Sequence, residues 1–174
     1  MEIDLYGWMP EENRITLEKL IKENNVRSVI EIGCFLGLST KFFVEQGCKV
    51  FAIDTFLGSK DINQSEEVRR RLPTLYEQFV FNMDALGIKE SVEVLRMSSD
   101  QAFKFSNLKA DLVYIDGSHE YGDVVNDIDM WFGRANKIIC GDDYTDVHDG
   151  VRRAVDELLP NANKSQRVWF LIKQ

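Results

Sequence analysis

Carboxylate side chains end or interrupt several short apolar runs of this 174-residue chain, and they are the groups best suited to chemistry. Glu31 lies within the first run, Asp54 and Asp116 end two others, and Asp142 and Asp143 follow a fourth. If the runs are parallel strands of one sheet, these acids gather at its carboxyl edge, where such sheets bind ligands. The pattern therefore predicts one site assembled from several strand ends.

Asp116, Asp142 and Asp143 are three carboxylates that follow two of these strands. Neighbouring strands lie about 5 Å apart, so the three acids would raise one another's pKa unless a cation lay between them. Oxygen ligands of this kind favour Mg²⁺, Ca²⁺ or Mn²⁺ over zinc. The alternative is that the acids are solvated separately or cap a helix.

His119 is one of two histidines and follows Asp116 by three residues, in a predicted turn above the sheet. A neutral imidazole there could accept the proton of a substrate hydroxyl. A capping or packed histidine is the alternative. His148, in the loop after Asp143, carries less weight.

A glycine loop follows the first run, with Gly33 and Gly37 in a G-x-x-x-G spacing and Ser39 in the segment after it. Gly33 allows a sharp turn, and the first turn of a helix presents unpaired N–H groups that suit a carboxylate or a phosphate. No lysine follows the second glycine, so this is not a P-loop, and the spacing differs from the G-x-G-x-x-G dinucleotide fingerprint. An ordinary turn with a solvated Glu31 is the alternative.

Asp54 lies about 20 residues beyond this loop, where an acid is the expected acceptor for a ribose diol. A solvated aspartate at a strand end is the alternative reading. Ser98 and Ser99 follow a further strand and could hydrogen-bond an adenine edge, although helix capping explains them equally well.

The segments between these residues predict alternating strands and helices. We predict strands at 29–32, 49–54, 91–95, 111–116, 137–141 and 168–172, with room for a brief strand at 161–166. We predict helices at 10–25, 38–46, 73–86, 98–105, 121–132 and 150–159. This order predicts an α/β fold, a doubly wound and mostly parallel sheet with a final antiparallel strand.

The length fits one domain over residues 1–174. Residues 1–25 are an N-terminal helical segment, with an apolar face that we assign to Ile15, Leu17 and Leu20 among others. Residues 55–72 are polar and resist assignment, and we interpret them as an insert or lid over the strand ends. The alternative is a plain surface excursion with a helical turn.

Composition excludes several classes of partner. The net charge of −8 argues against a nucleic-acid backbone or an anionic membrane as the main partner. The three cysteines are widely spaced without a C-x-x-C pattern, so we expect buried free thiols in a reducing compartment. The N-terminus lacks a signal pattern and no apolar run could span a bilayer, so we expect a cytoplasmic protein.

Five motifs give the chain a resemblance to class I S-adenosylmethionine-dependent methyltransferases: VIEIGCFLGLST, FAIDTFLGS, VLRMSSDQAF, LVYIDGSHEYGDVVNDI and IICGDDYTDVHDGVRRAVDE. Within them it resembles the metal-dependent O-methyltransferases of small molecules and sugars, including the macrocin and mycinamicin enzymes. IDGSHEY followed by GDDY is the most specific part. The resemblance covers about residues 26–157 and implies a Rossmann-like methyltransferase fold.

The resemblance also implies roles for individual residues. The implied cofactor-binding residues are Glu31, Gly33, Cys34, Gly37, Ser39, Asp54, Thr55, Ser98, Ser99 and Asp116. Asp116, Asp142 and Asp143 match the ligands of a divalent metal such as Mg²⁺, and His119, with Asp116, matches the catalytic residues. Because the chain has little sequence for a substrate cap, the acceptor pocket is expected to be open or completed by a second subunit in a homo-oligomer.

Two functions from different classes follow. The first is a metal-dependent O-methyltransferase that acts on a hydroxyl of a small molecule, with S-adenosylmethionine as methyl donor. The second is a non-catalytic module that binds S-adenosylmethionine or a nucleotide. A nicotinamide oxidoreductase is disfavoured by the glycine spacing.

Overall fold

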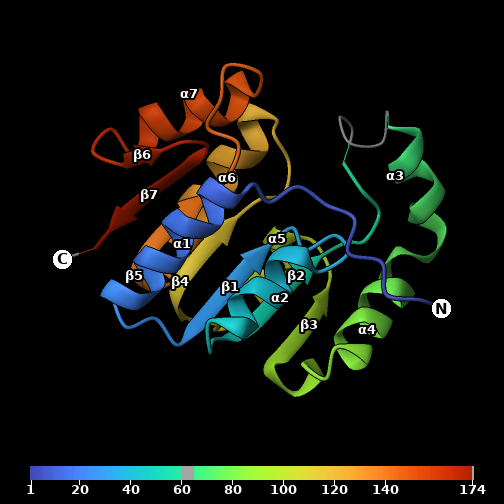
Figure 1. The fold of residues 1–174 in the computed structure, drawn as a ribbon. Coiled ribbons are helices and arrows are strands. Elements are labelled where there is room, and N and C mark those ends of the chain that lie inside the picture. The colour runs from blue at the N-terminus through green and yellow to red at the C-terminus, as the bar shows by residue number, and fades with distance from the viewer. Residues whose placement is uncertain (60–64, 174) are drawn as a thin grey trace.

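The computed structural model describes residues 1–59 and 65–173, in which a central sheet lies between two layers of helices (Figure 1). The strands of this sheet are β1 (Ser28–Ile32), β2 (Lys49–Asp54), β3 (Val92–Arg96), β4 (Ala110–Ile115), β5 (Ala135–Gly141), β6 (Asn163–Ser165) and β7 (Val168–Ile172). Their order is β3-β2-β1-β4-β5-β7-β6. Strands β1 to β5 are parallel, and β7 is antiparallel to both β5 and β6. The predicted fold is confirmed, including the brief strand within 161–166.

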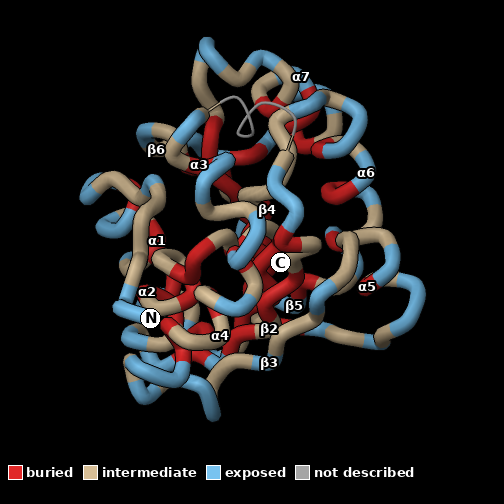
Figure 2. The backbone as a smooth tube through the Cα atoms, turned by 90° about the vertical axis from the view of Figure 1, so that its right-hand side faces the viewer, coloured by how far each residue is buried: buried red, intermediate tan, exposed pale blue. Residues whose placement is uncertain are grey.

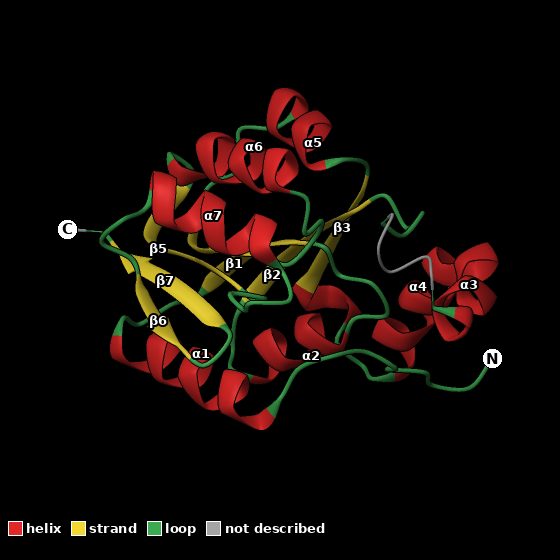
Figure 3. Cartoon of the chain, turned by 90° about the horizontal axis from the view of Figure 1, so that it is seen from above, coloured by secondary structure: helices red, strands yellow, loops and turns green. Residues whose placement is uncertain are grey.

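Helices cover both faces of the sheet, as the view from above shows (Figure 3). One layer holds α1 (Glu11–Glu23), α2 (Leu38–Glu45) and α4 (Leu75–Ala85), and the other holds α5 (Ser99–Phe105), α6 (Tyr121–Phe132) and α7 (Asp149–Leu158). Because side chains alternate along a strand, each face has its own core: Val29 and Tyr114 pack on the α1 side, and Ile30 and Val113 on the α6 side. The buried segments accordingly run through the centre of the molecule (Figure 2).

The buried face of α1 differs from the predicted one. Asn13, Leu17, Leu20 and Ile21 are its buried residues, whereas Ile15 is 58% exposed. The i, i+4, i+7, i+8 spacing of the first four places them on one stripe of a helix, and Ile15 lies off that stripe. The assignment of Ile15 to the apolar face is therefore wrong, and a polar residue takes a core position.

Part of the predicted insert at 55–72 is helical, while residues 60–64 lie outside the described part. Helix α3 (Glu66–Arg71) buries Val68, and Arg71 donates a hydrogen bond to Asp4 at 2.8 Å. Asn82 of α4 bonds the backbone N–H and C=O of Asp4. The segment before α1 is thus fixed against α3 and α4. The helical turn of the alternative interpretation is present as α3, and its tertiary contacts were not predicted.

Cys34, Cys48 and Cys140 are buried and free, as predicted. Within residues 1–59 and 65–173, every helix is too short or too polar to cross a lipid bilayer.

Candidate active site

Four predicted site residues emerge side by side at the carboxyl edge of the sheet. The last paired residues of β1, β2, β4 and β5 are in register, so the residues that follow them, Gly33, Asp54, Asp116 and Asp142, lie next to one another. Strands β4 and β5 are neighbours, which the metal prediction required. The fold therefore assembles one site from strand ends far apart in sequence.

Gly33 forms the contact between the ends of β1 and β4. Its φ is +87°, and a Cβ built on it would lie 2.2 Å from the backbone oxygen of Asp116. Only glycine fits this position, because any side chain would clash with backbone and the positive φ would strain it. The glycine loop consequently lies directly against the end of β4.

The first of two cavities at this edge has a volume of about 390 Å³. The predicted cofactor-binding residues that line it are Gly33, Asp54, Thr55, Ser98, Ser99 and Asp116. Of the others, Cys34 and Ser39 line the second cavity, whereas Glu31 and Gly37 are buried and line neither cavity. This cavity therefore collects most of the residues predicted for the cofactor.

Asp54 holds the glycine loop in place. Its Oδ2 accepts hydrogen bonds from the N–H groups of Cys34 and Phe35, both at 2.9 Å, and its Oδ1 accepts from Phe56 N–H at 2.7 Å. Oδ2 already accepts two hydrogen bonds, whereas Oδ1 accepts one and keeps a lone pair. Asp54 can thus order the loop and still accept a ribose hydroxyl, and that second role stays a prediction.

Ser98 and Ser99 have different surroundings. Ser98 forms a capping box with Gln101 at the start of α5, so the capping alternative describes Ser98. Ser99 donates to Asp127 Oδ1 and accepts a hydrogen bond from Trp131 Nε1 at 2.8 Å. Both serine hydroxyls therefore already have hydrogen-bond partners within the protein.

Glu31 is a fully buried carboxylate between β1 and α2. Thr40 Oγ1 donates to its Oε2 at 2.5 Å, while its Oε1 has no hydrogen-bond partner in the described structure. Burial raises the pKa of Glu31 to about 7, although the hydroxyls of Ser39 and Thr40 oppose the shift. A buried acceptor without a partner is costly when it is charged, which agrees with the raised pKa of Glu31.

The second cavity has a volume of about 430 Å³ and shares Gly33, Phe35 and Asp116 with the first. Tyr6 and Trp8, from the segment before α1, line it on one side. Its other lining residues include His119, Asp142, Asp143, His148 and Arg167. An aromatic wall and a polar, charged wall therefore face the same space.

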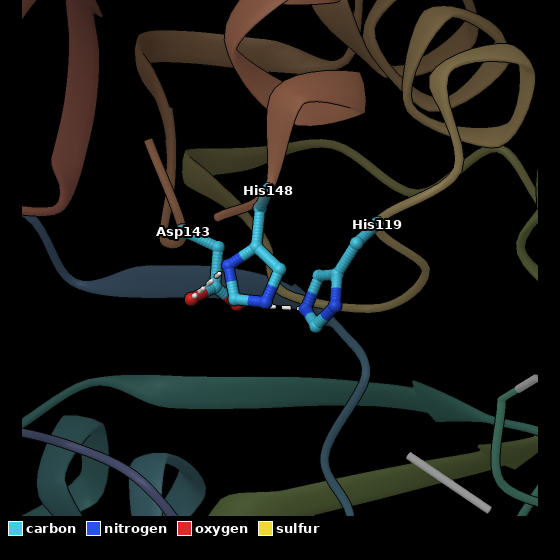
Figure 4. A group of neighbouring side chains, drawn as sticks. All are labelled: His119, Asp143 and His148. Atoms are coloured by element: carbon cyan, nitrogen blue, oxygen red, sulfur yellow. Dashed lines mark ion pairs between the residues drawn. The ribbon is translucent and has the colours of Figure 1, made fainter. Parts of the chain in front are cut away.

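Two neighbouring imidazole rings, those of His119 and His148, face the carboxylate of Asp143 (Figure 4). His119 Nε2 lies 2.7 Å from Asp143 Oδ2, and His148 Nδ1 lies 3.1 Å from Asp143 Oδ1. The ring centroids of the histidines are 4.1 Å apart. A carboxylate in contact with an imidazole stabilises its protonated form, so this arrangement suits a histidine that accepts a proton.

Arg167 and Asn13 supply further donors to the paired acids. The Arg167 guanidinium bonds Asp143 Oδ1 and reaches Asp142 Oδ1 at 3.4 Å. Asn13 Nδ2 donates to Asp142 Oδ2 at 2.8 Å, and the Asp143 N–H donates to Asp142 Oδ1 at 2.6 Å. Every oxygen of Asp142 and Asp143 therefore has a protein partner.

These contacts separate the three acids electrostatically. Burial, with the charges of Asp142 and Asp143, raises the pKa of Asp116 well above its usual range. Burial also raises the pKa of Asp142, with Asp143 adding to the shift. Burial acts the same way on Asp143, but His119, His148 and Arg167 outweigh it and lower its pKa. Asp143 is thus the anion of the cluster.

The donor atoms that converge are not those of the predicted metal site. In the described part of the chain, His119, Asp143 and His148 form the group whose ligand atoms all lie within 4.8 Å of one another. Asp116, Asp142 and Asp143 do not form such a group, because the last two turn their oxygens to protein donors. A mixed nitrogen and oxygen set suits transition metals rather than Mg²⁺, so a magnesium site on the three aspartates stays a prediction.

Four residues of the site escaped the sequence reasoning: Asn13, Asp127, Trp8 and Arg167. Asn13 carried a signal, since a polar residue on the buried stripe of a helix needs a partner. Asp127 carried the same signal on α6. Arg167 and Trp8 carried none, because only the fold brings the segment before β7 and the N-terminal segment to this edge.

The sequence of residues 30–144 matches a family described as a methyltransferase domain, over more than half of the chain. No curated protein sequence matches the chain significantly.

Solved structures with the same fold include three with high coverage. A putative caffeoyl-CoA O-methyltransferase from Staphylococcus aureus is 14% identical with a TM-score of 0.70, covering 97% of this chain and 86% of its own. An O-methyltransferase from Bacillus cereus in complex with SAH is 14% identical with a TM-score of 0.67, covering 98% and 84%. A putative rRNA-methylase from Clostridium thermocellum is 11% identical with a TM-score of 0.67, covering 96% and 100%.

The similar structures differ in their described substrates, so they support the Rossmann-like fold and leave the acceptor open. The family match over the glycine loop and strands β1 to β5 carries the assignment. The chain belongs to the methyltransferase-domain family, and it is an S-adenosylmethionine-dependent methyltransferase.

Proposed function

We propose that this protein transfers the methyl group of S-adenosylmethionine to a hydroxyl of a small molecule. The observation that carries the proposal is the meeting of the two cavities at Gly33, Phe35 and Asp116. A donor in the first cavity and an acceptor in the second would approach each other there, as direct transfer needs. Two of the similar structures are described as O-methyltransferases, one of them in complex with SAH, which supports this reaction.

The residues of the first cavity fit the donor. Asp54 would accept a ribose hydroxyl. Glu31 lines neither cavity, so the glycine loop would have to move before the enclosed Oε1 of Glu31 could receive the ammonium of the methionine end. Gly33 keeps the loop free of a side chain where the two cavities join. When bound, S-adenosylmethionine supplies an electrophilic methyl group, and these residues hold and orient it.

The residues of the second cavity would prepare the acceptor. His119 would accept the proton of the hydroxyl, and Asp143 would stabilise the imidazolium that forms. Arg167 keeps Asp143 ionised and in place. Tyr6 and Trp8 would hold the apolar part of the acceptor against the opposite wall.

The sequence also predicted a magnesium ion bound by Asp116, Asp142 and Asp143. The conformations of these side chains in the structure do not fit such an ion. The oxygens of Asp142 and Asp143 are bound by protein donors, one of them the guanidinium of Arg167. A dication would have to displace that positive charge. We therefore derive proton transfer from His119 and Asp143 alone, and chelation tests the difference.

The experiment is a screen of hydroxylated metabolites with release of S-adenosylhomocysteine as the readout, run with and without excess chelator. An acceptor-dependent, chelator-resistant signal is the expected result. Structured RNA is included as a separate arm, although the net charge of −8 argues against it. S-adenosylmethionine binding without turnover on any acceptor would favour the non-catalytic binding module, and activity abolished by the chelator would favour the metal.

A further inference from the structure

A buried carboxylate on α6 lines the first cavity and has no part in the mechanism above. Asp127 is 8% exposed, and it lines the cavity together with Asn126 and Met130 of the same helix. Among the described residues, no basic side chain bonds Asp127, and its hydrogen bond comes from the Ser99 hydroxyl. An acid so buried requires an explanation, since burying a carboxylate without a strong partner is unfavourable.

The hydrogen bonds around Asp127 have a fixed direction. Trp131 Nε1–H can only donate, and it donates to Ser99 Oγ at 2.8 Å. The Ser99 hydroxyl therefore directs its own proton to Asp127 Oδ1. This chain of donors holds the carboxylate in one orientation and uses up the only proton that Ser99 could offer the cavity.

The second oxygen of Asp127 is left to the cavity. Among the described residues, only Ser99 hydrogen-bonds the Asp127 carboxylate, and it bonds Oδ1, so Oδ2 has no partner there. Oδ2 is also not one of the unpartnered polar atoms that are fully enclosed by protein. Burial raises the pKa of Asp127 to about 6, Ser99 opposes the shift, and the charges of Asp123 and Asp100 add to it. At neutral pH the group is thus mostly an ionised acceptor that requires a donor from the ligand.

We propose that Asp127 recognises the 6-amino group of the cofactor's adenine. That amino group is the base's exocyclic donor, and a fixed carboxylate that can only accept is its complement. A base with a carbonyl oxygen at that position would place two acceptors face to face, so the cavity would reject it. The inference depends on cofactor binding and not on the acceptor, so it can fail or hold independently of O-methylation.

The test compares the binding of S-adenosylhomocysteine and S-inosylhomocysteine, which carries a carbonyl in place of the amino group, by calorimetry. The wild-type protein should bind the adenine ligand at least about tenfold more tightly, because the other leaves buried polar groups unpaired. In Asp127→Asn the preference should shrink or invert, since the amide can donate to the carbonyl. Asp123→Asn is the matched control: Asp123 lines the same cavity and accepts from Ser118, and its variant should keep the wild-type preference.

Asp127 could instead serve only to brace Ser99 and Trp131. In that case Asp127→Asn would lower the melting temperature or weaken both ligands equally, and the wild-type preference would survive in it. Equal binding of the two ligands by the wild-type protein would also overturn the proposal. If the asparagine variant does not fold, Asp127→Glu, which moves the carboxylate by one methylene, is measured in the same way and should also lose the preference.

Discussion

The two cavities at the carboxyl edge of the sheet hold their carboxylates in different ways. Of the described residues that line the first cavity, none is basic, and Asp54 and Asp127 accept only from neutral N–H and O–H donors. Asp100, which also lines it, is the exception, because it pairs with the exposed Lys104. In the second cavity, Asp143 lies against two histidines and a guanidinium. The same residue type thus occurs in two electrostatic settings, one on each side of Gly33.

This difference assigns the two cavities different tasks. Carboxylates without protein cations attract a ligand that brings its own positive charge and hydroxyl donors, as a sulfonium with an ammonium and a ribose does. A carboxylate already paired with imidazole gains nothing from such a ligand, but it stabilises a proton that arrives on the ring. We therefore assign cofactor binding to the first cavity and proton transfer to the second. Substitutions at four residues, with control variants, test this assignment.

The largest effect is expected at His119. His119→Ala should lower turnover by about 10²–10⁴-fold, the usual contribution of a positioned base. It should leave S-adenosylhomocysteine affinity unchanged, because His119 lines the second cavity and not the first. Turnover and calorimetry on the same preparation measure both. His148→Ala is the comparison variant and should lower turnover less. A fully active His119→Ala would contradict the assignment of proton transfer to the second cavity.

Arg167 is expected to matter for stability. Arg167→Met leaves Asp142 and Asp143 without their cation, and it should lower the free energy of unfolding by about 2–3 kcal/mol, less than for a fully buried pair because the Arg167 side chain is 36% exposed. Denaturant unfolding measures this. Added Mg²⁺ or Mn²⁺ should restore part of the loss, since a dication can replace the missing charge.

The matched control for that variant is Arg152→Met. Arg152 pairs with Asp146 and Asp149 on an exposed surface, where such contacts contribute about 0–1 kcal/mol. Equal losses in the two variants would contradict the view that the second cavity holds its acids by specific pairing.

Asp54 tests the first cavity. Asp54→Ala removes the predicted ribose acceptor, two hydrogen bonds to the glycine loop and one to Phe56 N–H, so S-adenosylhomocysteine affinity should fall by about 1–3 kcal/mol. Asp54→Asn keeps one acceptor oxygen and should lose less. Unchanged affinity by calorimetry in the alanine variant would show that the carboxylate serves the loop alone.

The smallest effect concerns Glu31 and pH. Because burial raises its pKa to about 7, Glu31 is protonated below pH 7 in the free protein and must lose that proton to pair with an ammonium. Affinity for S-adenosylhomocysteine should therefore rise with pH and level off above 7, with up to about tenfold change per unit below it. Titrations between about pH 5.5 and 8.5 measure this. Glu31→Gln should flatten the profile, and an unflattened one would assign the dependence to another group.

Local sequence features predicted most of the fold. The bounds of β2, β7 and α6 agree with the prediction residue for residue, because the two strands have continuous apolar runs and the helix a strong helical period. The terminal positions of other elements moved by one or two residues, as frayed ends do. Residues 66–71 were missed, since six mostly charged residues show no apolar period and their helix depends on burying Val68.

The sequence by itself determined which residues line the carboxyl edge. Strand ends, glycine spacing and the alternation of strands with helices are local, and they place Gly33, Asp54 and Asp116 there without any long-range information.

Only the tertiary structure decided the charge state and partners of that edge. Three acids at the ends of two neighbouring strands predict a metal when their other neighbours are unknown, but α1 brings Asn13 and the segment before β7 brings Arg167 to the oxygens of Asp142. These contacts join residues more than 20 positions apart. Whether a buried carboxylate needs a metal, a proton or a guanidinium depends on everything within a few ångströms of it, and local sequence does not contain that information.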